Sequence, residues 1–362
     1  MFRTYAHQID SDARKGRGAA SNAPGRFERQ ERAPEHDGWE IAEDMQQIRT
    51  EVSDEHPRSL INYTTSPDLP FERTINPYRG CEHGCIYCFA RPTHGYLGLS
   101  AGLDFETKLV ARPDAAEVLA RELGRKSYKV APIAIGTNTD PYQPIERDRK
   151  IMRSCLEVLE VHRHPVMITT KGTGILRDLD ILKRMARLGL VQVGISITTL
   201  DPEIARRMEP RVPRPEKRLE VVRGLARAGV PVRVMVSPVV PGLTEAEIEA
   251  ILAAANTAGA SSASWIMLRL PHEVSPLFQD WLAEHYPARA ARVMARLREM
   301  HGGKEYEAEW FRRMRGTGPY AAMIGQRFRL AVKRLGLDQA QPELRCDLFR
   351  VPVKPGEQLS LF

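Results

Sequence analysis

The 362-residue sequence contains no uninterrupted apolar run long enough to span a bilayer. Its first residues, MFRTYAHQIDSDARKG, lack the apolar stretch of a secretory signal. These two absences predict a protein without membrane spans and with a cytoplasmic location. Cysteine is also scarce, since only five are present and three of them fall within eight residues. This distribution argues against a disulfide scaffold and favours a metal site in a reducing compartment.

Acidic residues are sparse in one part of the chain. The formal net charge is +7, and positions 289 to 334 contain twelve Lys or Arg but only four Glu. A basic surface of this kind suits nucleic acid phosphates or another polyanion. A solvated face of basic helices accounts for the same residues, so both interpretations stay open.

Sustained apolar periodicity is missing from the first sixty residues, which are polar, charged and rich in Gly and Pro. We therefore expect a flexible polar N-terminal arm over residues 1–60. From about Phe71, short apolar runs rich in β-branched residues alternate with amphipathic stretches, three of which end at a glycine suited to a helix C-cap: Gly189, Gly229 and Gly259. The runs predicted to be strands are FERTINPY (71–78), APIAIGT (131–137), PVMITT (165–170), LVQVGISIT (190–198), VPVRVMVS (230–237) and SASWIMLRL (262–270).

Successive strand centres lie roughly 30 to 40 residues apart, which is the repeat of βαβ units in a parallel sheet. About six units in about 200 residues are too few for a complete eight-fold barrel of ~250 residues. The sequence predicts an α/β fold with a partial (β/α)6 TIM-like barrel over residues 61–275 and a helical basic C-terminal extension over 276–362. In such barrels the functional residues follow the carboxyl ends of the strands.

The first of these loops, TINPYRGCEHGCIYCFARPTHGY (74–96), contains Cys81, Cys85 and Cys88. Thiolates are the ligands of iron–sulfur clusters, which usually have four of them, so three close cysteines leave one iron open. The alternative is a zinc site in which His83 or His94 supplies the fourth ligand.

The spacing Cys-x₃-Cys-x₂-Cys, with Tyr87 immediately before the third cysteine, resembles the signature of the radical SAM superfamily. The resemblance implies that Cys81, Cys85 and Cys88 each bind one iron of a [4Fe–4S] cluster, that S-adenosylmethionine (SAM) chelates the fourth iron, and that Tyr87 packs near the adenine. It further implies a barrel of radical SAM type and reductive cleavage of SAM to a 5′-deoxyadenosyl radical. A one-electron reductant such as flavodoxin or ferredoxin would then be a partner.

The other strand ends supply candidate SAM-binding residues. Asp140 in GTNTDPYQPIE and Lys171 in ITTKG follow the second and third predicted strands, and Ser196 lies in the fourth. Arg207, in EIARRMEPR, is favoured over its neighbours for binding an anion, and Val240, in SPVVPGL, for facing the adenine. Each of these residues also has a purely structural interpretation: an ordinary turn at Asp140, a solvated side chain at Lys171 and a core position at Val240.

Together these segments look most like the spore photoproduct lyase-like branch of the superfamily. That likeness implies Lys171 and Ser196 as SAM contacts and, by analogy, a nucleic-acid substrate. Authentic lyases of this kind carry a hydrogen-donating cysteine just before the acidic turn residue, whereas residues 137–139 here are Thr, Asn and Thr. This difference argues against repair of a thymine photoproduct. Cys155 is interpreted as a buried structural cysteine, and Cys346 is ranked as structural too.

The leading hypothesis is a radical SAM enzyme of lyase-like type that acts on an unidentified substrate. The alternative is a nucleic-acid-binding module with a structural metal site and basic C-terminal helices. A structural site would normally complete its coordination with a fourth protein ligand, which favours the enzyme. The sequence predicts neither the hydrogen donor nor the oligomeric state.

Overall fold

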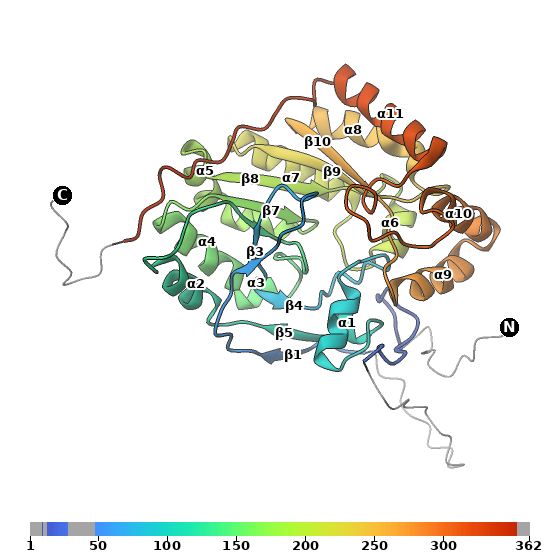
Figure 1. Ribbon diagram of the computed structural model, residues 1–362, viewed down its shortest axis with the longest axis horizontal. Coiled ribbons are helices and arrows are strands. Elements are labelled where there is room, and N and C mark those ends of the chain that lie inside the picture. The colour runs from blue at the N-terminus through green and yellow to red at the C-terminus, as the bar shows by residue number, and fades with distance from the viewer. Residues whose placement is uncertain (1–8, 10–12, 28–47, 353–362) are drawn as a thin grey trace, which may run out of the picture.

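The protein is described by a computed structural model that covers residue 9 and residues 13–27 and 48–352 (Figure 1). Its main sheet has seven strands in the order β10-β9-β8-β7-β6-β3-β2, and all neighbouring pairs are parallel except β2 with β3. The strands are β2 (Asn62–Tyr63), β3 (Arg73–Ile75), β6 (Ile133–Ile135), β7 (Val166–Thr170), β8 (Val191–Ser196), β9 (Val232–Val239) and β10 (Ser262–Met267). No pairing among the described residues joins β10 back to β2 or β3. The predicted α/β fold with a partial six-unit barrel is therefore confirmed.

Helices cover the outer face of this sheet because alternate strand residues are apolar. Val232, Val234 and Val236 of β9 are buried on that face. Gly229 and Gly259 follow two of the helices with φ of 79° and 101°, the left-handed conformation in which glycine ends a helix. The principal helices are α2 (Ala115–Leu123), α4 (Ile151–Val161), α5 (Leu179–Arg187), α7 (Pro215–Arg227) and α8 (Ile248–Thr257). Shorter ones are η1 (Arg91–Leu97), α1 (Asp104–Thr107), α3 (Glu146–Arg149), η2 (Thr173–Asp178), α6 (Pro202–Met208) and η3 (Glu245–Glu247).

A second, three-stranded sheet fastens the two ends of the cysteine-containing loop. β4 (Tyr78–Arg79) precedes the cysteines, and β5 (Lys108–Ala111) follows them. The two strands pair antiparallel, and β5 also pairs in parallel with β1 (Glu51–Asp54). The segment 80–107, which we call the cysteine loop, therefore leaves and returns to one small sheet.

Residues near the N-terminus depart from the predicted flexible arm. In the described parts of that arm, Ala19 and Leu60 are fully buried, and the amides of Leu60 and Ile61 donate hydrogen bonds to the carboxylate of Glu122. These polar segments are ordered through backbone hydrogen bonds to buried acceptors, which composition does not reveal. The remainder of the predicted arm, residues 1–8, 10–12 and 28–47, lies outside the described residues.

Three helices follow the barrel: α9 (Val274–His285), α10 (Pro287–Met300) and α11 (Gly318–Arg334). Figure 1 shows them on one side of the barrel, in orange to red. Trp265 of β10 packs against Phe328 of α11, with ring centroids 6.0 Å apart. An ion pair of 2.6 Å joins Arg313 to Asp68, which lies in the loop between β2 and β3. In the part of the chain that the structure describes, no helix is both long and apolar enough to cross a membrane.

Candidate functional site

The cysteine loop holds three free thiols at the carboxyl end of β3. Cys81 and Cys85 are buried, with 7% and 8% of their surface exposed, and Cys88 is partly buried. Burial and nearby Asp140 raise the pKa of Cys81, while burial and Glu209 raise the pKa of Cys85. A cationic iron centre would reverse these shifts and stabilise thiolates here. The donor set and its anionic surroundings therefore fit an iron–sulfur cluster.

The two histidines considered as zinc ligands make other contacts. His83 places its Nδ1 atom 3.3 Å from Oδ2 of Asp140, and Nε2 of His94 lies 2.8 Å from the carbonyl oxygen of Lys108. Among the described residues, no three His, Cys, Asp or Glu side chains are close enough together to hold one metal ion. A tetrahedral zinc needs such a compact group, because its bonds to sulfur are about 2.3 Å long. A four-iron cluster does not, because each cysteine binds a different iron.

Asp140 joins the cysteine loop to the ends of β6 and β7. Its Oδ1 atom accepts hydrogen bonds from the hydroxyl of Thr170 (2.6 Å) and the amide of Tyr142 (2.9 Å). Its Oδ2 atom accepts one from the amide of Lys171 (2.8 Å). Burial raises the pKa of Asp140, but His83 and these hydrogen bonds outweigh burial and lower it to about 2. Asp140 is thus an anionic support for the loops that surround the cysteines.

Lys171 carries a positive charge to the same edge. Its Nζ atom lies 5.8 Å from the ring centroid of Tyr87. Within the described part of the chain it forms no ion pair with a carboxylate. Its charge lowers the pKa of the nearby Glu209 and opposes the upward pKa shift of Cys85, and a cation beside the cysteine loop is suited to bind the carboxylate of a ligand.

Glu209, just after α6, organises a buried network that sequence reasoning missed. Its Oε1 atom accepts hydrogen bonds from the hydroxyls of Tyr87 and, at 2.7 Å, Thr198. Its Oε2 atom lies 2.8 Å from the guanidinium of Arg218. Burial raises the pKa of Glu209, whereas Arg218 and Lys171 lower it, and the net shift is downward. In the sequence Glu209 lies in the segment MEPR, next to Arg206, Arg207 and Arg211, and nothing there distinguishes it as a buried, functional carboxylate.

Ser196 lies beside this network. Its hydroxyl donates a hydrogen bond of 2.9 Å to the carbonyl of Ser237, which also accepts one of 3.2 Å from Thr198. Val240 is fully buried. The structure therefore brings Tyr87 and Ser196 into one group of contacts through Thr198.

Arg207 is engaged elsewhere. It pairs with Glu203 of the same helix, stacks over the ring of Tyr286 at 5.4 Å, and donates a hydrogen bond of 3.3 Å to the carbonyl of His285. These contacts tie α6 to the junction of α9 and α10. Arg211, four residues later, instead points to the cysteine loop and lies 3.5 Å from Glu82.

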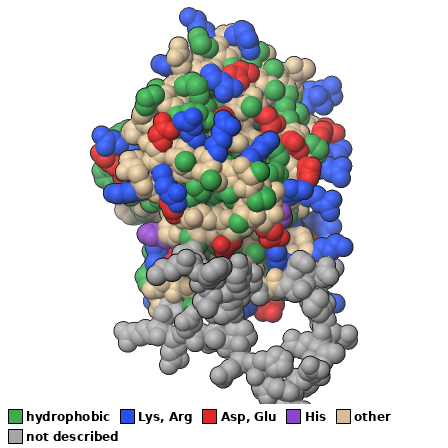
Figure 2. Space-filling model, turned by 90° about the vertical axis from the view of Figure 1, so that its right-hand side faces the viewer, with side chains coloured by type: hydrophobic (Ala, Val, Ile, Leu, Met, Phe, Trp, Pro, Cys, Tyr) green, Lys and Arg blue, Asp and Glu red, His purple; other side chains and the backbone are tan. Residues whose placement is uncertain are grey.

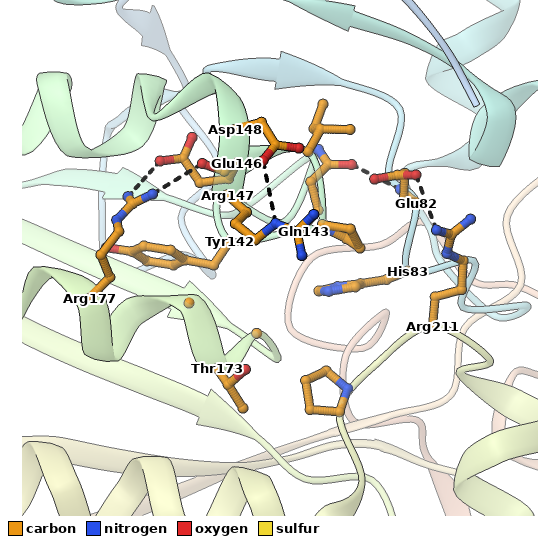
Figure 3. Close-up of a pocket in the computed structure, with 15 residues that line it drawn as sticks. Glu82, His83, Tyr142, Gln143, Glu146, Arg147, Asp148, Thr173, Arg177 and Arg211 are labelled. Carbon is orange, nitrogen blue, oxygen red and sulfur yellow. Dashed lines mark hydrogen bonds and ion pairs between the residues drawn. The ribbon is translucent and has the colours of Figure 1, made fainter. Parts of the chain in front are cut away.

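A cavity of about 740 Å³ opens beside the cysteine loop (Figure 3). Figure 3 shows its charged side chains paired along the wall, with Arg177 joined to Glu146 (2.6 Å) and Arg211 to Glu82. Three arginines and three carboxylates line it, so the lining is balanced in charge, although most of its accessible surface is apolar. The lining residues are Glu82, His83, Tyr142, Gln143, Pro144, Ile145, Glu146, Arg147, Asp148, Gly172, Thr173, Gly174, Arg177, Arg211 and Pro213.

Comparison with known proteins identifies the family. Residues 75–255 match the radical SAM superfamily. This range contains the cysteines, the last residue of β3 and the whole of β6, β7, β8 and β9. The chain belongs to the radical SAM superfamily. An uncharacterised protein of Mycobacterium tuberculosis is 38% identical over 248 residues, which cover 68% of this chain and 72% of that protein. One of Methanocaldococcus jannaschii is 27% identical over 187 residues, or 52% of this chain and 67% of that protein.

Solved structures show the same fold. Spore photoproduct lyase complexed with dinucleoside spore photoproduct has a TM-score of 0.56 at 16% identity, over 78% of this chain and 79% of that one. A lyase variant with bound AdoMet and the same dinucleoside has a TM-score of 0.54 at 15% identity, over 78% of each chain. The radical SAM fold of this protein is therefore similar to that of spore photoproduct lyase. Superfamily membership implies a [4Fe–4S] cluster and SAM as cofactors.

Proposed function

We propose that this protein is a radical SAM enzyme in which Cys81, Cys85 and Cys88 hold a [4Fe–4S] cluster. One observation supports this most: three free cysteines share a buried loop at the carboxyl edge of an open six-unit barrel. The other two cysteines lie apart, because Cys155 is buried in α4 and Cys346 lies in the segment after α11. No further cysteine of the described residues is thus placed in the loop to complete the coordination, which leaves one iron for SAM.

Residues of the barrel edge would bind and orient SAM. The cluster, when bound and reduced, supplies the electron that cleaves the sulfonium bond of SAM to a 5′-deoxyadenosyl radical. Lys171 provides a cation for the SAM carboxylate, and Tyr87, held in place by Glu209, provides an aromatic face for the adenine. Ser196 adds a hydroxyl at the same edge. Burial of these groups excludes water, which protects a reactive radical.

For the substrate we propose a nucleic acid or a component of one, in line with the dinucleoside named for the structural neighbours. The cavity beside the cysteine loop has a largely apolar surface with balanced charges and contains Tyr142 and His83, which suits a nucleoside better than a bare phosphate. Residues 137–139, which lie at the start of the β6 loop, contain no thiol. The reaction is therefore proposed to be lyase-like but distinct from thymine photoproduct repair. A cytoplasmic location and a flavodoxin- or ferredoxin-type reductant complete the proposal.

The first test is SAM cleavage by the reconstituted protein. After anaerobic loading with iron and sulfide and reduction with dithionite, we expect 5′-deoxyadenosine, measured by chromatography. The Cys85→Ala variant should form none above background, because the cluster loses a ligand. Cys346→Ala is the matched control and should retain the wild-type yield. Equal yields from wild type and Cys85→Ala would refute the assignment.

A second function, a nucleic-acid-binding module with a structural metal site, is favoured by the basic C-terminal helices. Figure 2 shows Lys and Arg side chains over the face where these helices lie, with acidic side chains among them. Efficient oligonucleotide binding by a loaded protein that forms no 5′-deoxyadenosine would support this module instead of the enzyme.

A further inference from the structure

Residues 17–23, which we call the N-terminal strap, dock onto the second half of the cysteine loop. The amide of Leu103 donates a hydrogen bond of 3.2 Å to the carbonyl of Ser21. Asn22 and Asp104 bond reciprocally, since the Asn22 amide donates to the carboxylate (3.0 Å) and its oxygen accepts from the Asp104 backbone (2.9 Å). The hydroxyl of Ser100 donates a bond of 2.6 Å to the carbonyl of Ala23. The strap is therefore held by one backbone hydrogen bond and by several bonds that involve the side chains of Asn22, Ser100 and Asp104.

Glu106 connects the strap to the cysteines. This carboxylate is fully buried. Its two oxygens accept hydrogen bonds from the backbone amides of Gly18 (2.8 Å) and Ala19 (2.9 Å). The Oε1 atom also accepts one of 2.5 Å from the fully buried guanidinium of Arg91. Arg91 in turn donates to the carbonyl of Cys85 (2.9 Å), so one carboxylate supports both the strap and the backbone of a cluster ligand.

Gly18 lies against the backbone between two of the cysteines. A Cβ atom at position 18 would lie 1.9 Å from the carbonyl oxygen of Gly84 and 3.1 Å from its carbon. Backbone cannot yield as a flexible side chain can, so any side chain at position 18 would push the strap and the cysteine loop apart. Gly84 stands next to Cys85, and this contact is therefore part of the wall around the thiols.

Arg17 supplies a second link, to the other end of the cysteine motif. Its guanidinium donates to the carbonyl of Glu106 (3.1 Å) and to the hydroxyl of Thr50 (3.1 Å). Thr50 then donates a bond of 2.6 Å to the carboxylate of Glu82, which follows Cys81 in the sequence. The strap thus supports the residues beside both buried cysteines.

We infer that the N-terminal strap is a wall of the cluster site and that Glu106 is a positioning residue which couples the strap to the ligand loop. This inference rests on the proposed function, because it assumes that the cysteines hold a cluster. The strap fixes the backbone on which Cys85 is mounted and excludes water and oxidants from that side. Its role is retention and protection of the cluster.

The test compares a glycine substitution inside the strap, at Gly18, with one two residues after its end, at Gly25. In Gly18→Ala the new Cβ meets the Gly84 backbone, whereas in the control Gly25→Ala it lies 3.6 Å from the nearest atom, an ordinary contact. Each protein is loaded anaerobically, its iron is counted, and the decay of the visible cluster absorbance is followed in air. We expect the Gly18→Ala cluster to decay at least ~10-fold faster than that of Gly25→Ala, the scale of a lost supporting contact at a metal site. Far-UV circular dichroism of the unloaded proteins should be alike, whereas the clash lowers the unfolding midpoint of Gly18→Ala, so decay is followed at a temperature well below both midpoints.

Glu106→Gln gives an independent measurement should Gly18→Ala fail to fold. The amide keeps one acceptor oxygen but turns an NH₂ group towards a donor, so one of the three hydrogen bonds is lost. Neutralising the buried partner of Arg91 lowers the stability of the unloaded protein, so cluster decay is compared at a temperature well below both unfolding midpoints. Faster decay there, with altered electron paramagnetic resonance of the reduced cluster, supports the inference. Decay equal to the wild type in both variants, or loss explained fully by unfolding, overturns it. A wild-type protein that takes up no iron overturns the proposed function itself, and the inference with it.

Discussion

The role of some side chains at the barrel edge can be predicted from their spacing in the sequence, and the role of others cannot. Cys81, Cys85 and Cys88 could be predicted because all three fall within eight residues of the sequence, a spacing typical of cluster ligands. The role of Glu209 could not, because its partner Arg218 is joined to it only by the fold, and a buried ion pair leaves no periodic trace in sequence. For the same reason, the sequence does not show which of the neighbouring arginines points to the cysteine loop. Arg207 was the predicted one, whereas in the fold Arg211 lies beside that loop.

Lys171 carries the residue-scale prediction. Replacement by alanine removes the cation at the cysteine loop, and because Asp140 is bound through the Lys171 amide, the loop itself should persist. We expect SAM affinity to fall about 10- to 100-fold, the value of one charge-assisted hydrogen bond of about 1.5–3 kcal/mol. A SAM titration of the loaded protein measures this, with iron content unchanged.

Lys183→Ala is the control for that measurement, since Lys183 is exposed on α5. It should bind SAM as the wild type does. Equal affinity in Lys171→Ala and Lys183→Ala would remove Lys171 from the site.

Among the secondary-structure elements, the six strands were predictable and the N-terminal strap was not. Strands such as β8 and β9 can be predicted from runs of β-branched residues, because one or both faces of these strands are buried. The strap is polar and docks through backbone hydrogen bonds and a glycine contact, for which residue type carries little information. Composition therefore predicted a flexible arm where the fold has an ordered wall.

The connection after β6 depends on Gly136. A Cβ atom there would lie 2.0 Å from the carbonyl of Thr169 in β7, and φ is +92°. We expect Gly136→Ala to lower the free energy of unfolding by about 3 kcal/mol, from overpacking plus left-handed strain. It should also weaken SAM binding, because the turn that carries Asp140 begins here.

Gly229→Ala is the comparison, because its φ of +79° is similar but nothing lies within 4 Å of the new atom. It should cost only about 1 kcal/mol in urea unfolding. Equal losses for the two variants would show that the contact with β7 is unimportant.

Across the whole molecule, several of the basic residues at positions 289–334 are paired with carboxylates. Arg296 bonds to Glu299, Arg312 to Glu309, and Arg327 to Glu249, each at 2.7–2.8 Å. Exposed pairs of this kind contribute little to stability, but they reduce the charge offered to a polyanion. The surface in Figure 2 is accordingly mixed in sign.

We therefore expect oligonucleotide binding through the C-terminal helices to be weak and sensitive to salt. With only a few phosphate contacts, affinity should fall about 10- to 100-fold between about 50 and 200 mM salt. Fluorescence anisotropy with a labelled oligonucleotide measures this. Tight binding that persists at high salt would contradict the expectation and point to recognition of bases elsewhere.

The antiparallel pairing of β4 with β5 has a consequence for how the protein acquires its metal. Tyr78 pairs with Ala111 and Arg79 with Val110, so the strand before the cysteine loop is hydrogen-bonded to the strand after it. The conformational entropy of closing this segment is lost during folding and not at metal insertion. Backbone pairing thus holds the two ends of the cysteine loop together, so iron and sulfide would bind within a loop whose ends are already fixed.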